Sequence, residues 1–290
     1  MDGLRVGATV ASQHHFLLAL DLIASRAANR WPEAALLGSV ARGMADDRSD
    51  IELGFWVEVL PSQDERAAWL ASIGGTEWRL DDRAVPCDAT WALFRFRGVW
   101  VEAAWYTPAF HDQELTTILR GEVTDGDRLH LPGALADAVV LRSVGILTGW
   151  QVRLARYPDV LAARLIADAV GAWRFPGHLT GRWTEARRGH RHTVLEECVR
   201  DLHRVWRILF AINGAWEMDW KWLAPAMGNL AIRPDDLVRR IEEIFQTAPL
   251  EEAVRRCLEL ARDTLALVPP PHDVTAAASV IGASLSQEAG

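Results

Sequence analysis

Two acidic residues separated by a single position are the feature of this sequence that points most directly to chemistry. Asp50 and Glu52 lie at the start of a stretch, residues 51–60, that is rich in Val, Phe and Trp and is predicted to be a strand. Residues i and i+2 of a strand face the same side, so the two carboxylates should lie close together. Like charges held together need a cation, and Mg²⁺ prefers one or two carboxylates together with substrate phosphates.

A glycine-serine pair precedes these acids. Gly38 and Ser39 follow a short apolar run, residues 34–37, which is predicted to be a strand that ends abruptly. Glycine lets the backbone turn and approach a ligand closely. Ser39 would begin a short helix, whose free N–H groups and dipole favour phosphate. Arg42 lies one turn further on and would add a charge-assisted contact, so the segment is predicted to bind a triphosphate.

Residues 36–43, LLGSVARG, and then 46–53, DDRSDIEL, resemble the signature of the nucleotidyltransferase (polymerase-beta-like) superfamily. The D-x-E form is similar to that of kanamycin-type antibiotic nucleotidyltransferases. The resemblance implies an Mg²⁺-dependent enzyme that moves a nucleoside monophosphate from an NTP to a hydroxyl of a small molecule and releases pyrophosphate. The acceptor would be an aminoglycoside-like antibiotic or a biosynthetic intermediate.

The same resemblance implies a third carboxylate on a later strand, in a Val-Glu-apolar context. Glu102 fits this context within VEAAW at 101–105. Residues 89–106 are predicted to form a hairpin, in which alternation separates Glu102 from the face that carries Val101. An acid among apolar neighbours is costly without a partner, and a metal ion would supply one. Asp88 is the alternative third ligand.

The second half of the chain is predicted to be helical. Apolar residues recur at helical spacing in five segments, 135–155, 160–173, 193–212, 235–245 and 251–267. The expected fold class is therefore α+β, with an N-terminal nucleotidyltransferase mixed sheet, flanking helices and a C-terminal helical bundle domain. We expect a catalytic domain at 1–128, a helical domain that closes over substrate and nucleotide at 129–268, and a mobile tail at 269–290.

The helical half resembles a bacterial branch of the superfamily in two short runs, LFAING at 209–214 and KWL at 221–223. That likeness implies a triphosphate contact for Lys221 and a pocket position for Asn213. Kanamycin-type enzymes also place a general base on a helix of the second domain, and no motif fixes its equivalent here. Asp168, on an otherwise apolar helix, is the candidate. The alternatives on the long helix are Glu196, Glu197 and Asp201.

Composition narrows the classes of partner. The 290 residues are 50% apolar and 24% charged, as in soluble globular proteins. A net charge of −8 argues against general nucleic-acid binding and would favour a cationic acceptor. The sequence leaves open whether the protein forms a homodimer. The sequence shows no secretory signal and no run of the ~18 apolar residues that a membrane span needs. Its three cysteines lack metal-binding spacing, so a cytoplasmic location is expected.

Two questions stay open from the sequence. One is a local basic cluster, which is either a binding patch or a solvated loop. Its members are Arg182, Arg187, Arg188, His190, Arg191 and His192. The other is the type of acceptor. The alternatives to a small-molecule enzyme are a protein-modifying (AMPylating) antitoxin-type nucleotidyltransferase and a non-catalytic nucleotide-binding relative.

Overall fold

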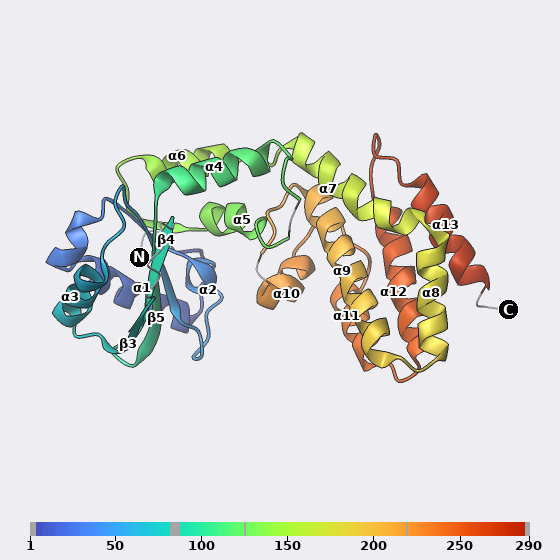
Figure 1. Ribbon diagram of the computed structural model, residues 1–290, viewed down its shortest axis with the longest axis horizontal. Coiled ribbons are helices and arrows are strands. Elements are labelled where there is room, and N and C mark those ends of the chain that lie inside the picture. The colour runs from blue at the N-terminus through green and yellow to red at the C-terminus, as the bar shows by residue number, and fades with distance from the viewer. Residues whose placement is uncertain (1–3, 82–87, 125, 219, 288–290) are drawn as a thin grey trace. The chain divides into compact units, whose positions relative to one another are not determined.

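The structure, a computed structural model, describes residues 4–81, 88–124, 126–218 and 220–287. The chain divides into two compact units (Figure 1). A sheet unit contains Met1–Thr116 and Leu131–Ala155, and a helical unit contains Thr117–His130 and Arg156–Gly290. The division differs from the single boundary expected after residue 128, because the segment 131–155 returns to the sheet.

The sheet has six strands within the described residues, and its order is β3-β4-β5-β2-β1-β6. Its strands are β1 (Glu33–Leu36), β2 (Ile51–Trp56), β3 (Thr76–Leu80), β4 (Ala89–Phe96), β5 (Val99–Tyr106) and β6 (Val139–Arg142). Strands β2 and β5 run parallel, and the other neighbours run antiparallel. The fold is therefore α+β with a mixed sheet, and the hairpin predicted for residues 89–106 is confirmed as β4 and β5.

The helices of the sheet unit surround this sheet. They are α1 (Val10–Ile23), the short η1 (Arg26–Arg30), α2 (Gly38–Ala41), α3 (Gln63–Ile73), α4 (Pro108–Leu119), α5 (His130–Ala136) and α6 (Ile146–Leu154). The end of α4 and the first residue of α5 fall within residues 117–130, which are assigned to the helical unit. Helices α1 and α3 pack on one sheet face, where Phe16 and Trp69 join a core that contains Phe55 and Trp105. The apolar alternation of β2 and β5 creates that face, because every second side chain turns toward it.

The opposite sheet face carries the acids. Val101, Ala103 and Trp105 are fully buried on the core side of β5, whereas Glu102 is exposed on the other side. Further along this second face, Trp56 donates a hydrogen bond from Nε1 to Nδ1 of His111 on α4, at 2.7 Å. The predicted separation of Glu102 from Val101 is therefore confirmed.

The segment 135–155, predicted as one helix, is instead α5, strand β6 and helix α6. Val139, Val140 and Leu141 form an apolar, partly β-branched run that pairs with the free edge of β1, and this long-range pairing overrides the helical spacing. Glu33, fully buried in β1, fixes the start of α6. Its carboxylate accepts from the backbone N–H groups of Val144, Ile146 and Leu147 at 2.8, 2.9 and 3.1 Å.

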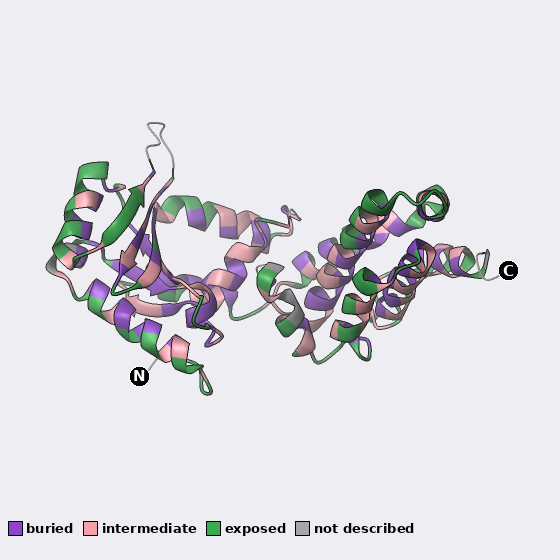
Figure 2. Ribbon diagram, turned by 90° about the horizontal axis from the view of Figure 1, so that it is seen from below, coloured by how far each residue is buried: buried purple, intermediate pink, exposed green. Residues whose placement is uncertain are grey.

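The helical unit is an all-helical bundle around a second core. Its helices are α7 (Asp159–Gly171), η2 (Ala172–Arg174), α8 (Pro176–Arg187), α9 (Arg191–Asn213), η3 (Trp220–Trp222), α10 (Leu223–Gly228), α11 (Leu237–Gln246), α12 (Leu250–Leu265) and α13 (Thr275–Gln287). Purple and green alternate around these helices in Figure 2, because one side of each faces the core. The four helices expected at 160–173, 193–212, 235–245 and 251–267 are present as α7, α9, α11 and α12.

The C-terminal segment differs from the mobile tail expected at 269–290. Helix α13 buries Ala277 and Ile281 completely in the helical core, and Trp183 of α8 donates a hydrogen bond to Ser284 Oγ at 2.9 Å. Ala277, Ile281 and Leu285, spaced four residues apart, form the buried face of α13. Among the described residues, none of the helices combines the length and the apolar character that crossing a membrane requires.

Candidate active site

Glu52 and Glu102 are register partners on the parallel strands β2 and β5. Side chains of paired residues point to the same sheet face, and the strands lie about 4.8 Å apart, so the two acids are neighbours. Glu52 is partly buried and Glu102 is exposed. The structure therefore brings together two of the acids that the sequence selects, although 50 positions separate them along the chain.

Gly38 lies directly against the carboxylate of Glu52. A Cβ atom at position 38 would be 2.4 Å from Glu52 Cδ and 2.5 Å from each carboxylate oxygen. Gly38 also has φ +62°, a left-handed backbone that disfavours other residues. The backbone N–H of Leu37 donates to the carbonyl of Glu52 at 2.8 Å, which fixes the turn to the strand. The glycine-serine turn and the acid thus form one local arrangement, which requires glycine for two separate reasons.

Tyr106 lies four residues after Glu102 on β5 and faces the same side of the sheet. Burial raises the pKa of its phenol to about 12, and the nearby carboxylates of Glu102 and Glu52 act in the same direction. Both carboxylates disfavour a phenolate because each adds like charge at short range. The phenol therefore stays protonated at neutral pH beside the two acids.

Asp50 lies one residue before β2 and is partly buried. Burial, and secondly the neighbouring His14, lower the pKa of His15 on α1, whereas the Asp50 carboxylate opposes that shift. Among the described residues, no group of three His, Cys, Asp or Glu side chains is arranged to hold a metal ion. A shared metal site of Asp50, Glu52 and Glu102 therefore stays a prediction.

The pair formed by Glu52 and Glu102 nevertheless fits Mg²⁺ in donor chemistry. Mg²⁺ is a hard cation that proteins bind through one or two carboxylates, with waters and substrate phosphates as its other ligands. The Cα of Gly38, which carries no side chain, lies against the Glu52 carboxylate. Residues Asp50, Glu52 and Glu102 remain the predicted metal ligands, with the last two on paired strand positions.

The two other residues of the predicted phosphate cradle are buried. Ser39 has an exposed fraction of 3%, and Arg42 of 6%. The Arg42 guanidinium donates from Nε to Oδ2 of Asp137 at 2.9 Å, and Asp137 also pairs with Arg5. Arg42 therefore connects α2 to the end of α5, which is a structural role that the sequence did not indicate. A phosphate contact from either residue stays a prediction.

Asp88, the alternative third ligand, directly precedes β4 and lies near the C-terminal end of β5. Ala89 pairs with Tyr106 and Leu93 pairs with Glu102, so Asp88 is five positions along β4 from the residue opposite Glu102. At about 3.3 Å per residue this is roughly 17 Å. The backbone N–H of Thr107 donates to the Asp88 carbonyl at 3.0 Å. This distance removes Asp88 from the candidate site.

The remaining predicted site residues belong to the helical unit. Asp168 is exposed on α7 and pairs with Arg164 one turn earlier, at 3.3 Å. Lys221 is exposed in η3. Asn213, expected in a pocket, instead ties the end of α9 to Ile232, whose backbone N–H and carbonyl it binds at 2.9 and 2.8 Å. The roles of Asp168 as general base and Lys221 as triphosphate contact stay predictions.

Glu217 is an acid that the sequence analysis overlooked. It is 8% exposed, and burial raises its pKa to about 7, although Arg207 lowers it in part. Its Oε1 has no hydrogen-bond partner within the described part of the chain. A carboxyl group that titrates near neutral pH can act as an acid or as a base. Its position between Trp216 and Met218 was the available signal, because an acid between large apolar residues is prone to burial.

Comparisons with known proteins add little to this geometry. No protein-family model matches the chain, and no curated protein matches it. One similar solved structure is the crystal structure of a nucleotidyltransferase-like protein from Exiguobacterium sibiricum. The two chains share 12% sequence identity over 89% of this chain and 74% of that chain, with a TM-score of 0.35. The candidate site therefore rests on the residues of this chain.

Proposed function

We propose that this chain is a nucleotidyltransferase that moves a nucleoside monophosphate from an NTP to a hydroxyl group of a small molecule. The observation that carries the proposal is the placement of Glu52 beside Gly38 and opposite Glu102. A close-approach turn next to paired carboxylates is what a metal-bound triphosphate needs, and the motif around residues 38–52 resembles the corresponding superfamily signature. Asp50 would complete the ligand set.

The reaction requires positioning and charge neutralisation more than covalent chemistry. The acceptor oxygen attacks the α-phosphorus, the bond to the β-phosphate oxygen breaks in line, and pyrophosphate leaves with the electron pair. Bound Mg²⁺ would neutralise the charge of the phosphate oxygens. In this chain, Glu52 and Glu102 would hold the metal, and Gly38 would admit the triphosphate to the turn. A base must take the acceptor proton, and Asp168 is the residue proposed from the sequence.

We propose a cationic acceptor such as an aminoglycoside, because the chain carries a net charge of −8. Net charge of this sign raises the encounter rate of a cationic substrate through long-range attraction. A biosynthetic intermediate with a free hydroxyl is the other member of this acceptor class.

The direct test incubates the protein with each α-labelled NTP, Mg²⁺ and a panel of hydroxylated acceptors that includes aminoglycosides. We expect label transfer to an acceptor with equimolar pyrophosphate, and loss of both with Glu52→Gln. Conversion of the labelled NTP to labelled NDP or NMP without transfer to an acceptor, or equal pyrophosphate from wild type and Glu52→Gln, would contradict the proposal.

A further inference from the structure

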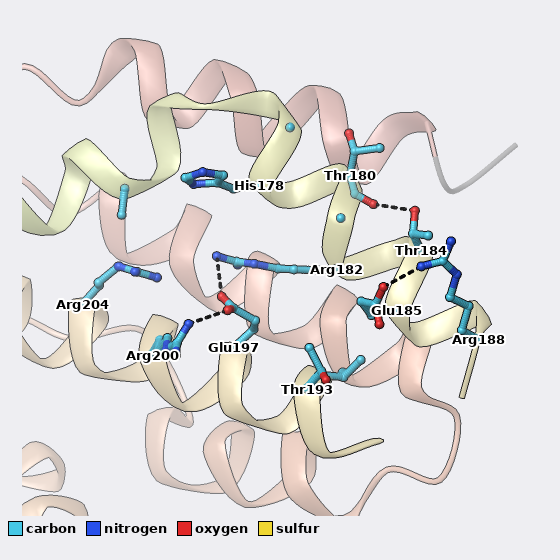
Figure 3. Close-up of a pocket in the computed structure, with 14 residues that line it drawn as sticks. His178, Thr180, Arg182, Thr184, Glu185, Arg188, Thr193, Glu197, Arg200 and Arg204 are labelled. Atoms are coloured by element: carbon cyan, nitrogen blue, oxygen red, sulfur yellow. Dashed lines mark hydrogen bonds and ion pairs between the residues drawn. The ribbon is translucent and has the colours of Figure 1, made fainter. Parts of the chain in front are cut away.

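A pocket of about 690 Å³ lies between α8 and α9 and is lined by residues of the helical unit (Figure 3). This volume is within the range of roughly 300–1,000 Å³ that is usual for small-molecule sites. Its charged lining consists of Arg182, Arg188, Arg200, Arg204, Glu185 and Glu197. Of the residues predicted for nucleotide transfer, Glu197, an alternative general base, lines it, whereas the proposed metal and phosphate ligands do not, so the pocket requires a separate explanation.

The pocket is built around one buried ion-pair centre. Asp201 is fully buried, and it accepts hydrogen bonds from Trp173 Nε1 at 2.7 Å and from Arg204 at 2.6 Å. Arg182 also pairs with Asp201. One carboxylate therefore holds two guanidinium groups at the pocket wall, where their geometry is fixed and their charge exceeds that of their common partner.

Arg182 has hydrogen-bonding capacity that the protein leaves unused. It is 6% exposed, and its Nε–H has no acceptor within the described residues. Its second contact, with Glu197, is long at 3.7 Å. In Figure 3 its side chain extends across the pocket from α8 toward Glu197. A buried donor without a partner is rare and costly, and an acceptor supplied by a ligand would satisfy it.

The surrounding charge also favours an anion. The pocket lining carries four arginines and two glutamates, and the fully buried Asp201 pairs with two of the arginines, whereas the whole chain has a net charge of −8. Arg200 is bound to Glu197 at 2.8 Å and to Glu196 at 2.5 Å, and Arg188 is bound to Glu185 at 2.9 Å. A guanidinium has five N–H donors, so these pairs leave donors for a ligand. The basic cluster around residues 182–192 is thus in part a pocket wall, not only a solvated loop.

Two glycines leave one side of the pocket open. Gly177 and Gly181 are one turn apart on α8, and nothing lies within 4 Å of a Cβ built at either position. Glycine inside a helix costs about 1 kcal/mol relative to alanine, and no close packing here requires it. The bare helix surface provides room for the body of a ligand.

We propose that this pocket binds a small organic polyanion, of about the size of a nucleotide, whose phosphate or carboxylate groups meet the arginines. Planar guanidinium groups recognise both kinds of oxyanion through paired N–H donors. The site belongs to the helical unit alone, and its occupation does not depend on the transfer reaction.

The test is calorimetric titration of the intact chain with ATP and, separately, with citrate, in the presence of EDTA so that no divalent cation contributes. We expect ATP, citrate or both to bind with a 1:1 stoichiometry at the pocket, and the two arms distinguish phosphate from carboxylate as the preferred group. Arg200→Gln should weaken this binding about tenfold, as expected for the loss of a charge-assisted contact. Gly181→Leu should abolish it by filling the open side, while its helix propensity preserves folding.

Arg187→Gln is the matched control, because Arg187 is on the same helix, carries the same charge and does not line the pocket. Circular dichroism and thermal melting check that each variant is folded. Three results would overturn the proposal: no binding of either anion, equal weakening by Arg187→Gln and Arg200→Gln, or unchanged binding in folded Gly181→Leu.

Discussion

Glu52 and Glu102 occupy matching register positions on two parallel strands, with the Cα of Gly38 packed against the first of them. Parallel pairing of β2 with β5 is the topological step that brings the two acids together, because β5 enters the sheet beside β2 after the hairpin with β4. In the proposed function the pair holds a cation, which would offset the repulsion between like charges.

Neutralising either acid should remove transfer and preserve the fold. Glu52→Gln and Glu102→Gln each lose a proposed metal ligand, and several kcal/mol of transition-state stabilisation correspond to a fall in kcat of about 100-fold or more. Stability in urea should be unchanged or slightly higher, because charge repulsion is relieved. Glu77→Gln, an exposed acid on β3, is the control and should keep full activity. Near-normal turnover in either site variant would exclude that residue from the metal site.

Gly38→Ala should inactivate the enzyme, and Gly98→Ala should not. Both glycines have a positive φ, +62° and +86°, so each substitution introduces backbone strain of about 1–2 kcal/mol. An added Cβ at Gly98 meets open space, whereas at Gly38 it collides with the Glu52 carboxylate. Comparing urea unfolding with transfer activity separates the two effects. Equal activity in the two variants would show that contact with Glu52 is irrelevant to function.

Removing the Glu33 carboxylate should destabilise the sheet unit. Three backbone N–H groups at the start of α6 would lose their acceptor, and the loss of the one buried bond, that of Leu147, costs about 1–3 kcal/mol. We expect Glu33→Ala to lower the free energy of unfolding by that amount, and Glu33→Gln by less because an amide oxygen still accepts. Hydrogen exchange at Val144, Ile146 and Leu147 should accelerate in Glu33→Ala. Unchanged stability and exchange would contradict the capping role.

His111 should make the protein less stable as the pH falls. Burial lowers its pKa from 6.5 to about 4, and Nδ1 accepts from Trp56, so the folded state keeps the ring neutral. Below pH 6.5 His111 becomes protonated in the unfolded chain but stays neutral in the folded chain. The free energy of unfolding therefore falls progressively down to about pH 4. Between pH 7 and pH 5 this residue should account for about 2 kcal/mol.

His111→Gln tests this effect, because the glutamine oxygen can still accept a hydrogen bond and does not titrate. Urea unfolding at pH 7 and at pH 5 should show a smaller loss of stability in the variant than in the wild type. An identical loss in both proteins would assign the pH dependence to other groups, of which His203, with a pKa also lowered by burial to about 4, is the first to examine.

Local patterns were sufficient to predict the hairpin and the face of Glu102. Strict alternation along 99–106 separates Val101, Ala103 and Trp105 from Glu102, and this alternation survives folding because one face of the sheet is a core. The turn at Gly38 was also visible, because a positive φ next to a strand end calls for glycine.

Features that depend on distant partners could not be predicted in this way. Strand β6 exists because β1 offers it an edge, and the isolated segment has helical spacing. Arg42 looks like a phosphate ligand in sequence, yet its partner Asp137 is 95 positions away. The pocket between α8 and α9 depends on Asp201, one of several acids on a long helix, and burial alone distinguishes it from Glu196 and Glu197.

The central claim is that Glu52 and Glu102 hold the metal of an NTP bound at the Gly38 turn, and Mg²⁺-dependent NTP binding tests it without knowledge of the acceptor. Each of the four NTPs, as a non-hydrolysable α,β-methylene analogue, is titrated into the protein with Mg²⁺ and with EDTA. We predict that at least one analogue binds more than tenfold more tightly with Mg²⁺, and that Glu52→Gln and Glu102→Gln abolish this gain while leaving any metal-independent binding unchanged. Binding that is equally tight with Mg²⁺ and with EDTA, or a Mg²⁺ effect that survives in both variants, would contradict the account.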